Sequence, residues 1–151
     1  MTRTRCKVPA TSATHRGRMS TTPTTTATVV DAFLAAVTSG EGVPESMYAP
    51  GATLDATVPN WRLTCRGPAA IAEEYGRWFA HPGHFDELAR HPIDGGEVVT
   101  YLLTWFEHGV PHAAHHCHVL HLDDDGRIAA DTVFCGGRWP ASLLAEMGAS
   151  Q

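Results

Sequence analysis

The residues best suited to chemistry in this sequence are two histidines and one aspartate. His116 and His118 lie two positions apart in a segment that predicts a strand, so both side chains project from the same face. Asp131 lies in the next predicted strand. An imidazole changes charge near neutral pH, and a nearby carboxylate fixes its tautomer and raises its basicity. We expect His118 to exchange a proton with a substrate, Asp131 to orient it, and His116 to bind a substrate oxygen.

Two other interpretations of these side chains remain open. A core histidine that is hydrogen-bonded to a neighbour is a common structural feature, and it would give His118 no chemical role. His116 and His118 together with Asp131 also have the composition of a zinc or iron site. All these interpretations depend on the strand register, because a slip of one residue would turn the opposite set inward: His115, Cys117, Val119 and His121.

The elements that position these residues are predicted strands of an antiparallel meander. Alternating runs cover residues 85–91, 98–107, 113–122 and 128–135, and turn signals rich in Gly, Pro and Asp separate them. In the strand over residues 98–107, the side chains expected on the inner face are large, and one of them carries a hydroxyl group. They are expected to form part of a pocket wall: Tyr101, Leu103 and Trp105.

Helices and further strands are predicted before this meander. Apolar residues at helical spacing predict a first helix over residues 26–40 and a second over 67–79, each bounded by Gly or Pro signals. Between the two helices we expect a short helical turn at 44–48, an alternating strand at 53–58 and a second strand at 62–66. These elements together predict an α+β fold.

The inner side of the second helix adds candidates to the pocket. Trp78 falls on the same side as Tyr75 and is expected to form an aromatic wall with Tyr101 and Trp105, although ordinary core packing produces the same pattern. Glu74 lies one position from this side, where a solvated carboxylate is the commoner role and a place at the cavity mouth is the alternative.

Length and composition predict one domain with a segment at each end. The chain has 151 residues and 43% hydrophobic content, which suffices for one core. Residues 1–25 are basic, rich in Thr and Ser, and expected to be disordered, with Met19 as an alternative start of translation. Residues 26–139 are expected to form the domain, and residues 140–151 a short C-terminal helix or tail.

The charge distribution and the cysteines narrow the class of protein. From residue 31 onward the chain has six arginines against sixteen acidic residues, so the folded part is not expected to bind nucleic acid. It has no apolar run of the roughly 18 to 20 residues that a membrane span needs. The four cysteines show no CxxC spacing. We therefore expect a soluble, cytoplasmic protein with reduced thiols.

The order and spacing of these elements resemble the nuclear transport factor 2-like superfamily, which includes SnoaL-like polyketide cyclases, ketosteroid isomerases and scytalone dehydratase. The resemblance covers residues 26–139 and includes the segments Tyr48–Leu54, Pro68–Phe79 and Asp124–Ile128. It implies a cone-shaped, strongly curved antiparallel sheet that wraps around the N-terminal helices and encloses one pocket. It also implies that the following side chains join the histidines in contacting a substrate: Tyr101, Leu103, Trp105, Trp78, Phe33, Leu120, Val133 and Cys135.

The resemblance does not extend to the chemistry of ketosteroid isomerases. The position of their oxyanion-binding tyrosine falls on Phe33, and that of their carboxylate base falls on Ala56 or Val58. Only the acid that partners the tyrosine has an ionisable counterpart, His118.

We therefore expect a SnoaL-like enzyme of the isomerase, cyclase or dehydratase type. It would act by general acid/base chemistry on a small, mostly apolar organic molecule, without an organic cofactor. Most members of the superfamily work without a metal, so none is expected. The alternative is a small-molecule-binding or accessory domain without catalysis, since this fold hosts both.

The outer face of the predicted sheet suggests a partner. It is not wholly polar, which is typical of a face covered by another subunit. We expect a homodimer whose contact area includes Leu102, Phe106, Cys117 and Val119.

Overall fold

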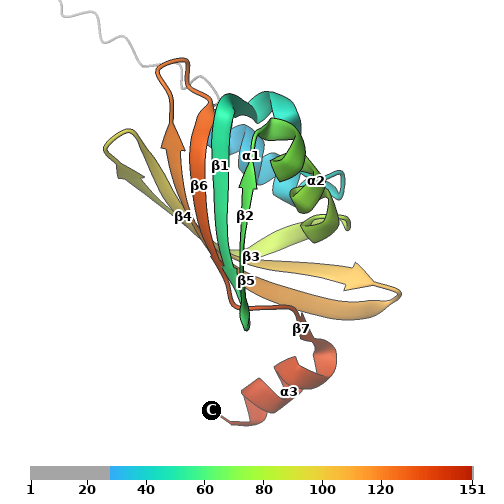
Figure 1. Cartoon of the computed structure of the whole chain (residues 1–151). Helices are drawn as coiled ribbons and strands as arrows, with labels where there is room; N and C mark the ends of the chain where they lie inside the picture. Colours follow the sequence, from blue (N-terminus) through green and yellow to red (C-terminus); the bar gives the residue numbers. More distant parts are fainter. Residues whose placement is uncertain (1–27, 151) are drawn as a thin grey trace, which may run out of the picture.

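A computed structural model describes residues 28–150, and the tail expected over residues 1–25 lies outside this range. Helix α1 (Val29–Ser39) and a 3-10 turn, η1 (Glu45–Met47), precede strands β1 (Tyr48–Val58) and β2 (Trp61–Arg66). Helix α2 (Pro68–Trp78) leads into β3 (Gly83–Ile93), β4 (Gly96–Glu107), β5 (Val110–Leu122) and β6 (Ile128–Cys135). The chain ends in β7 (Trp139–Pro140) and helix α3 (Ala141–Ala149) (Figure 1).

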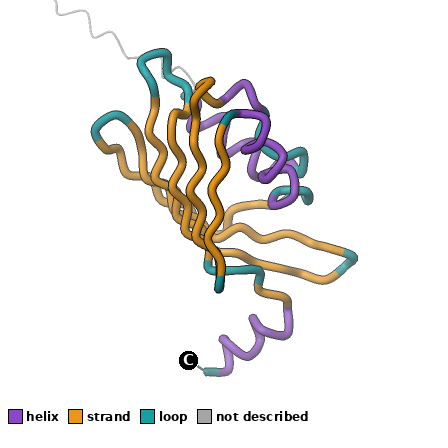
Figure 2. The backbone as a smooth tube through the Cα atoms, in the orientation of Figure 1, coloured by secondary structure: helices purple, strands orange, loops and turns teal. Residues whose placement is uncertain are grey.

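The strands form one curved sheet in the order β2-β1-β6-β5-β4-β3, and β7 pairs with β5. Helices α1 and α2 lie on one face of this sheet (Figure 2). The predicted α+β class with a strongly curved sheet is confirmed. The neighbouring strands pair antiparallel except β1 and β6, which run parallel, so the sheet is mixed rather than purely antiparallel. No helix in residues 28–150 is long and apolar enough to cross a membrane.

Helix α1 is defined by signals at both ends. The Asp31 N–H donates to the Thr28 hydroxyl at 3.2 Å, and the Thr28 N–H donates to the Asp31 carboxylate at 2.6 Å, which together form a capping box. Gly40 ends the helix with a φ of 81°, a conformation that suits glycine. Its buried residues recur at the helical spacing on which the predicted helix rests: Val30, Phe33, Leu34 and Val37.

The hairpin strands are longer than predicted. The strand predicted over residues 85–91 continues in the structure to Ile93, and Pro92 pairs with Glu97 inside the β3–β4 ladder. A proline is tolerated there because β3 is an edge strand, whose outward-facing backbone positions need no N–H donor. His108 and Gly109 both have positive φ, at 51° and 76°, which matches the twist that a two-residue hairpin turn requires.

The register of β5 is the predicted one. Ala114, His116, His118 and Leu120 are buried, whereas His115 and His121 are exposed. On β4, Tyr101 lies opposite His116, and Val99 lies opposite His118. The inner face of the sheet therefore carries both histidines into the core beneath the helices.

The close approach of β4 and β5 at Gly96 leads to a first prediction. A Cβ added at Gly96 would lie 1.9 Å from the Leu120 carbonyl oxygen, a backbone atom that cannot rotate away. We expect Gly96→Ala to lower the free energy of unfolding, measured in urea, by about 1–3 kcal/mol. Gly51→Ala is the matched control, because nothing lies within 4 Å of the added Cβ. Equal midpoints for the two variants would contradict this packing.

Candidate active site

A fully buried polar network joins β4, β5, β6 and α2. His118 Nδ1 lies 3.0 Å from Asp131 Oδ1, and the Tyr75 hydroxyl donates to Asp131 Oδ2 at 2.5 Å. The Tyr101 hydroxyl lies 2.9 Å from His118 Nε2. A carboxylate can only accept, so Asp131 accepts the Nδ1 proton, and Nε2 shares the second hydrogen bond with the Tyr101 hydroxyl. Both nitrogens of His118 are therefore occupied by protein groups.

Strand pairing and helix packing hold this network in place. Asp131 lies opposite Leu120 on β5, two positions beyond His118, so the carboxylate and the imidazole project from neighbouring strands on the same face. The Phe33 ring meets the His118 ring edge-on at 5.1 Å, and the Tyr75 ring meets it at 6.2 Å. The two helices thus close the network off from the outside.

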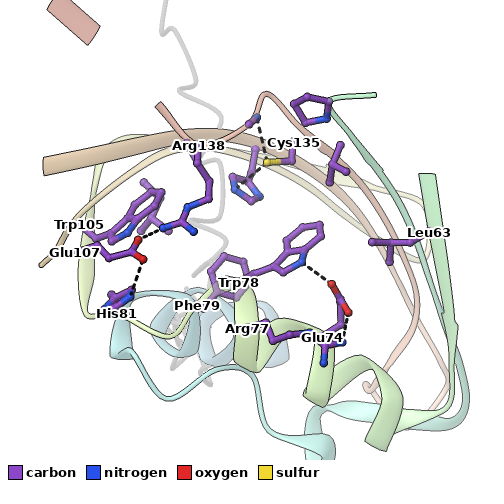
Figure 3. A pocket seen from close by; sticks show the side chains of 16 residues that line it. Leu63, Glu74, Arg77, Trp78, Phe79, His81, Trp105, Glu107, Cys135 and Arg138 are labelled. Carbon is purple, nitrogen blue, oxygen red and sulfur yellow. Dashed lines mark hydrogen bonds and ion pairs between the residues drawn. The ribbon is translucent and has the colours of Figure 1, made fainter. Parts of the chain in front are cut away.

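A cavity of about 560 Å³ lies beside this network, on the inner face of the sheet. Its wall comes from β1, β2, α2, β4, β5, β6 and the segments that follow α2 and β6, and it is mainly apolar and aromatic (Figure 3). Trp78, Phe79 and Trp105 supply its aromatic surface. A volume in this range suits a small organic molecule.

Of the two buried histidines on β5, His116 is the one that reaches this wall. Its side chain is buried, with 4% of the residue exposed, and Nδ1 has no hydrogen-bond partner among the described residues. Its Nε2 lies 3.5 Å from the Cys135 sulfur, and its ring stacks on Tyr101 with centroids 5.1 Å apart. Burial, with smaller effects from His118 and His115, lowers the His116 pKa to about 3. The imidazole is therefore neutral at neutral pH.

Two ion pairs lie on opposite sides of Trp78 in this wall (Figure 3). Arg77 pairs with Glu74, which also accepts the Trp78 indole N–H at 2.8 Å. Burial opposes ionisation of Glu74, but the hydrogen bonds from Arg77 and Trp78 outweigh it and lower the carboxyl pKa.

In the second pair, Arg138 binds Glu107 and lies over the Trp105 ring at 5.5 Å. His81 approaches the same carboxylate at 3.8 Å. Each wall carboxylate thus has an arginine beside it.

The structure separates the predicted site residues into two groups. The first group lies on the cavity wall: His116, Leu103, Trp105, Trp78 and Cys135. The second lies in the buried core next to the cavity and is not part of its wall: His118, Asp131, Tyr101, Phe33, Leu120 and Val133. Alternation correctly predicted that these side chains point to the inner face of the sheet. Whether each one lines the cavity or is covered depends on where the helices pack against that face.

Four polar wall residues did not stand out as site residues in the sequence: Glu107, Arg138, Arg77 and His81. Glu107 could have been found, since it continues the alternating set of Leu103 and Trp105 on β4. Arg138 follows two glycines outside any periodic segment, so no pattern marks it. The sequence did raise Glu74 as a residue of the cavity mouth, and Glu74 is on the wall.

The arrangement gives no support to a metal site. Within residues 28–150, no three His, Cys, Asp or Glu side chains are grouped so that they could hold a metal ion. His118 bonds Asp131 and Tyr101, while His116 contacts Cys135 instead.

Comparisons with known proteins identify the fold. No family model matches the chain, and no curated protein matches it. A hypothetical protein with a ketosteroid isomerase-like fold from Catenulispora acidiphila DSM 44928, in complex with trimethylamine, matches with a TM-score of 0.59 and 18% identity over 80% of this chain and 92% of that chain.

Two enzymes are also similar in structure. SalBIII, an epoxide hydrolase/cyclase-like enzyme with a role in pyran ring formation in the polyether salinomycin, gives a TM-score of 0.56 and 16% identity over 72% of this chain and 88% of that chain. An LEH-like epoxide hydrolase from M. tuberculosis gives a TM-score of 0.55 and 15% identity over 71% of this chain and 79% of that chain. At such identities the likeness shows the fold alone, and it confirms the fold that the resemblance implied.

The depressed pKa of His116 predicts a pH-dependent stability. In the unfolded chain an imidazole titrates near 6.5, whereas His116 in the folded chain titrates at about 3. Between these pH values the unfolded state binds a proton that the folded state does not. The contribution of His116 to the free energy of unfolding is therefore complete above pH 6.5 and is lost as the pH falls toward 3. As the pH is lowered, we expect this group to reduce the free energy of unfolding with a slope that approaches about 1.4 kcal/mol per pH unit.

Urea unfolding of wild type and His116→Leu between pH 5 and 7 measures this slope. The variant should show a flatter profile, and the control His91→Gln, at an exposed position on β3, should follow the wild type. Parallel profiles for wild type and His116→Leu would show that His116 is not held neutral by the fold.

Proposed function

We propose that this chain is a SnoaL-like enzyme that binds a small, mostly apolar organic molecule in the cavity and isomerises, cyclises or dehydrates it by acid/base chemistry, without an organic cofactor. One observation carries the proposal: the buried His116 imidazole on the cavity wall has an Nδ1 without a partner in the described part of the chain. An unpaired buried polar atom costs about 1–3 kcal/mol. A ligand oxygen that reaches Nδ1 through a small shift of the buried ring would remove that cost.

The electrostatics of the wall support an uncharged ligand. Glu74 and Glu107 are each paired with an arginine, and His116 is neutral, so no charged group on the described part of the wall is left without a partner. A charged ligand would have to compete for these pairs after losing its own hydration. The aromatic surface of Trp78, Phe79 and Trp105 instead favours a hydrophobic skeleton.

The proposed chemistry uses His116 as the group that contacts the substrate oxygen. A neutral imidazole can polarise a carbonyl or ether oxygen and bind it more strongly as negative charge develops there. A proton must also leave a neighbouring carbon, and the described wall offers two carboxylates for this step, Glu74 and Glu107. Each would act as a base once its arginine moves toward the substrate.

The roles expected for His118 and Asp131 stay proposals. Direct proton exchange between His118 and a substrate requires the Tyr101 hydroxyl to leave Nε2, because both ring nitrogens are bonded. A positioning role needs no such movement. In that role the Asp131–His118–Tyr101 chain holds the Tyr101 ring, against which His116 stacks.

Turnover assays test the catalytic proposal. We expect purified wild type to convert at least one member of a panel of polycyclic ketones and epoxides, with products detected by mass spectrometry. His116→Leu should lower kcat/KM about 100-fold or more, as removal of an oxyanion donor does. Asp131→Asn should have a smaller effect, and Cys117→Ser on the outer face should have none. Equal turnover by wild type and His116→Leu would remove His116 from the mechanism.

A binding domain without catalysis is the second candidate. The observation that favours it is the complete hydrogen bonding of His118 within the protein, which leaves the strongest expected base occupied. Tight binding of panel members without product, in wild type and in Glu74→Gln and Glu107→Gln alike, would favour this candidate over the enzyme.

We also propose that the chain forms a homodimer through the outer face of the sheet. Phe106 and Phe134 are exposed there, at 68% and 51%, and Leu102, Cys117 and Val119 are half-buried on the same face. Helices α1 and α2 lie on the opposite face (Figure 1). A second copy of this face would bury these rings by two-fold pairing, as isologous dimers do.

Sedimentation analysis tests the dimer. Wild type should sediment as a dimer at micromolar concentration, and the double variant Phe106→Asp/Phe134→Asp should sediment as a monomer, because two buried carboxylates per subunit would oppose association. Trp61→Asp is the control, since Trp61 is 70% exposed but lies on the inner side of β2. A monomeric wild type would overturn the proposal.

A further inference from the structure

We propose that Glu107 is the base that removes a proton from the bound molecule, and that His81 passes this proton on to the solvent. These roles rest on the proposed function, which places an organic molecule in the cavity and leaves open which of the two wall carboxylates, Glu74 or Glu107, acts as the base. The two carboxylates differ in their hydrogen bonds and in how firmly the arginine beside each of them is held.

Both oxygens of Glu74 are already hydrogen-bonded. Its Oε1 accepts the Trp78 indole N–H at 2.8 Å, and its Oε2 accepts a hydrogen bond from Arg77. Although burial opposes ionisation of Glu74, these hydrogen bonds lower its carboxyl pKa, which makes it a weaker base. Protonation of Glu74 would also weaken its bond with the indole. Glu74 is therefore suited to holding Trp78 in the wall rather than to taking a proton.

The two oxygens of Glu107 have different surroundings. Oε2 is buried and lies against the Arg138 guanidinium. Oε1 accepts no hydrogen bond from the described residues, and His81 Nε2 lies 3.8 Å from it. The Glu107 side chain keeps 22% of its surface exposed, and its carboxylate points into the cavity between Arg138 and His81 (Figure 3). Oε1 is therefore the oxygen that can meet a C–H group of a bound molecule.

Arg138 is held less firmly than Arg77. Arg77 binds two carboxylates, Glu73 and Glu74, whereas Arg138 has Glu107 as its one carboxylate partner within residues 28–150. The Arg138 guanidinium lies over the Trp105 ring, 5.5 Å from its centre, and a shift along this ring would keep the cation–π contact. Such a shift would leave the Glu107 carboxylate without its cation and make it a stronger base.

His81 connects Glu107 with the solvent. It lies in the segment that follows α2, on the cavity wall, and 39% of its side chain is exposed. A rotation of the imidazole or one bridging water molecule would close the 3.8 Å between Nε2 and Glu107 Oε1. An imidazole accepts a proton at one nitrogen and releases one from the other. His81 would thus return Glu107 to its charged form.

The proposed step can be written for a ketone. Glu107 takes a proton from the carbon next to the carbonyl group, the electron pair of the broken C–H bond forms the C=C bond of an enolate, and the carbonyl oxygen gains the negative charge. Return of a proton to the same carbon restores the ketone, and its return to another carbon of a conjugated system gives an isomer. The step needs no oxidant or reductant.

An epoxide probe locates the reactive carboxylate. A carboxylate oxygen attacks a ring carbon of 1,2-epoxy-3-phenoxypropane, the ring C–O bond opens, and the released oxygen takes a proton from water. After incubation of the full-length protein, mass spectrometry of its peptides should find this ester on Glu107 and not on Glu74. Glu107→Gln should remove it, and Glu87→Gln, at an exposed position on β3, should leave it unchanged. A label on Glu74, or none on Glu107, would overturn the proposal.

Deuterium exchange tests the proton transfer itself. In heavy water, wild type should accelerate exchange of the C2 hydrogens of 1-tetralone, followed by proton NMR, and Glu107→Gln should lower this acceleration about 100-fold or more. Glu87→Gln should match wild type. His81→Ala should also be slower, and added imidazole should restore part of its rate, which a merely structural role of His81 would not allow. Equal exchange by wild type and Glu107→Gln would show that Glu107 is not the base, and equal exchange by His81→Ala would remove His81 from the proton path.

The inferred roles and the proposed function fail in different ways. Calorimetry shows whether wild type binds 1-tetralone. If it does not, the proposed function is wrong for this class of ligand, and the epoxide label still decides between Glu74 and Glu107. If 1-tetralone binds and its exchange is not accelerated, the cavity assignment stands and the role of Glu107 as a base is wrong.

Discussion

The contact between His118 and Asp131 is the constraint on which the interior of this protein depends. An imidazole and a carboxylate are both fully buried here, 3.0 Å apart, and each needs hydrogen bonds to compensate for lost hydration. Tyr101 and Tyr75 supply them from β4 and α2. Loss of any member leaves a buried polar group unpaired, which ties the strand register, the position of α2 and the inner wall of the cavity to one network.

This network also explains why the two histidines of β5 have different environments. They share one face of the strand and lie two positions apart, or roughly 6.6 Å along it. Phe33 of α1 and Tyr75 of α2 cover the ring of His118. His116 lies one step closer to the open end, where Trp78 and Phe79 border a cavity. Two identical side chains thus become a core residue with both nitrogens hydrogen-bonded and a wall residue whose Nδ1 has no partner among the described residues.

Local signals in the sequence explain how much of this could be predicted. Alternation on β4 and β5 depends only on neighbouring residues, and it gave the inward set correctly, from Tyr101 to Trp105 and from Ala114 to Leu120. The parallel pairing of β1 with β6 joins segments that are far apart in the chain, and no local pattern marks it. The depth of each side chain is likewise set by helix packing, which alternation does not record.

The polar residues of the wall share one property that bears on chemistry. In the resting protein each wall carboxylate has a guanidinium beside it, and the imidazole is neutral, so the cavity has little unbalanced charge. Such a wall gains little by binding a neutral ground state electrostatically. Under the proposed function, the neutral His116 imidazole would interact more strongly with a substrate oxygen once negative charge develops there in an apolar surrounding. Only interactions that strengthen in the transition state accelerate a reaction, and that is the role which the proposed function gives to His116.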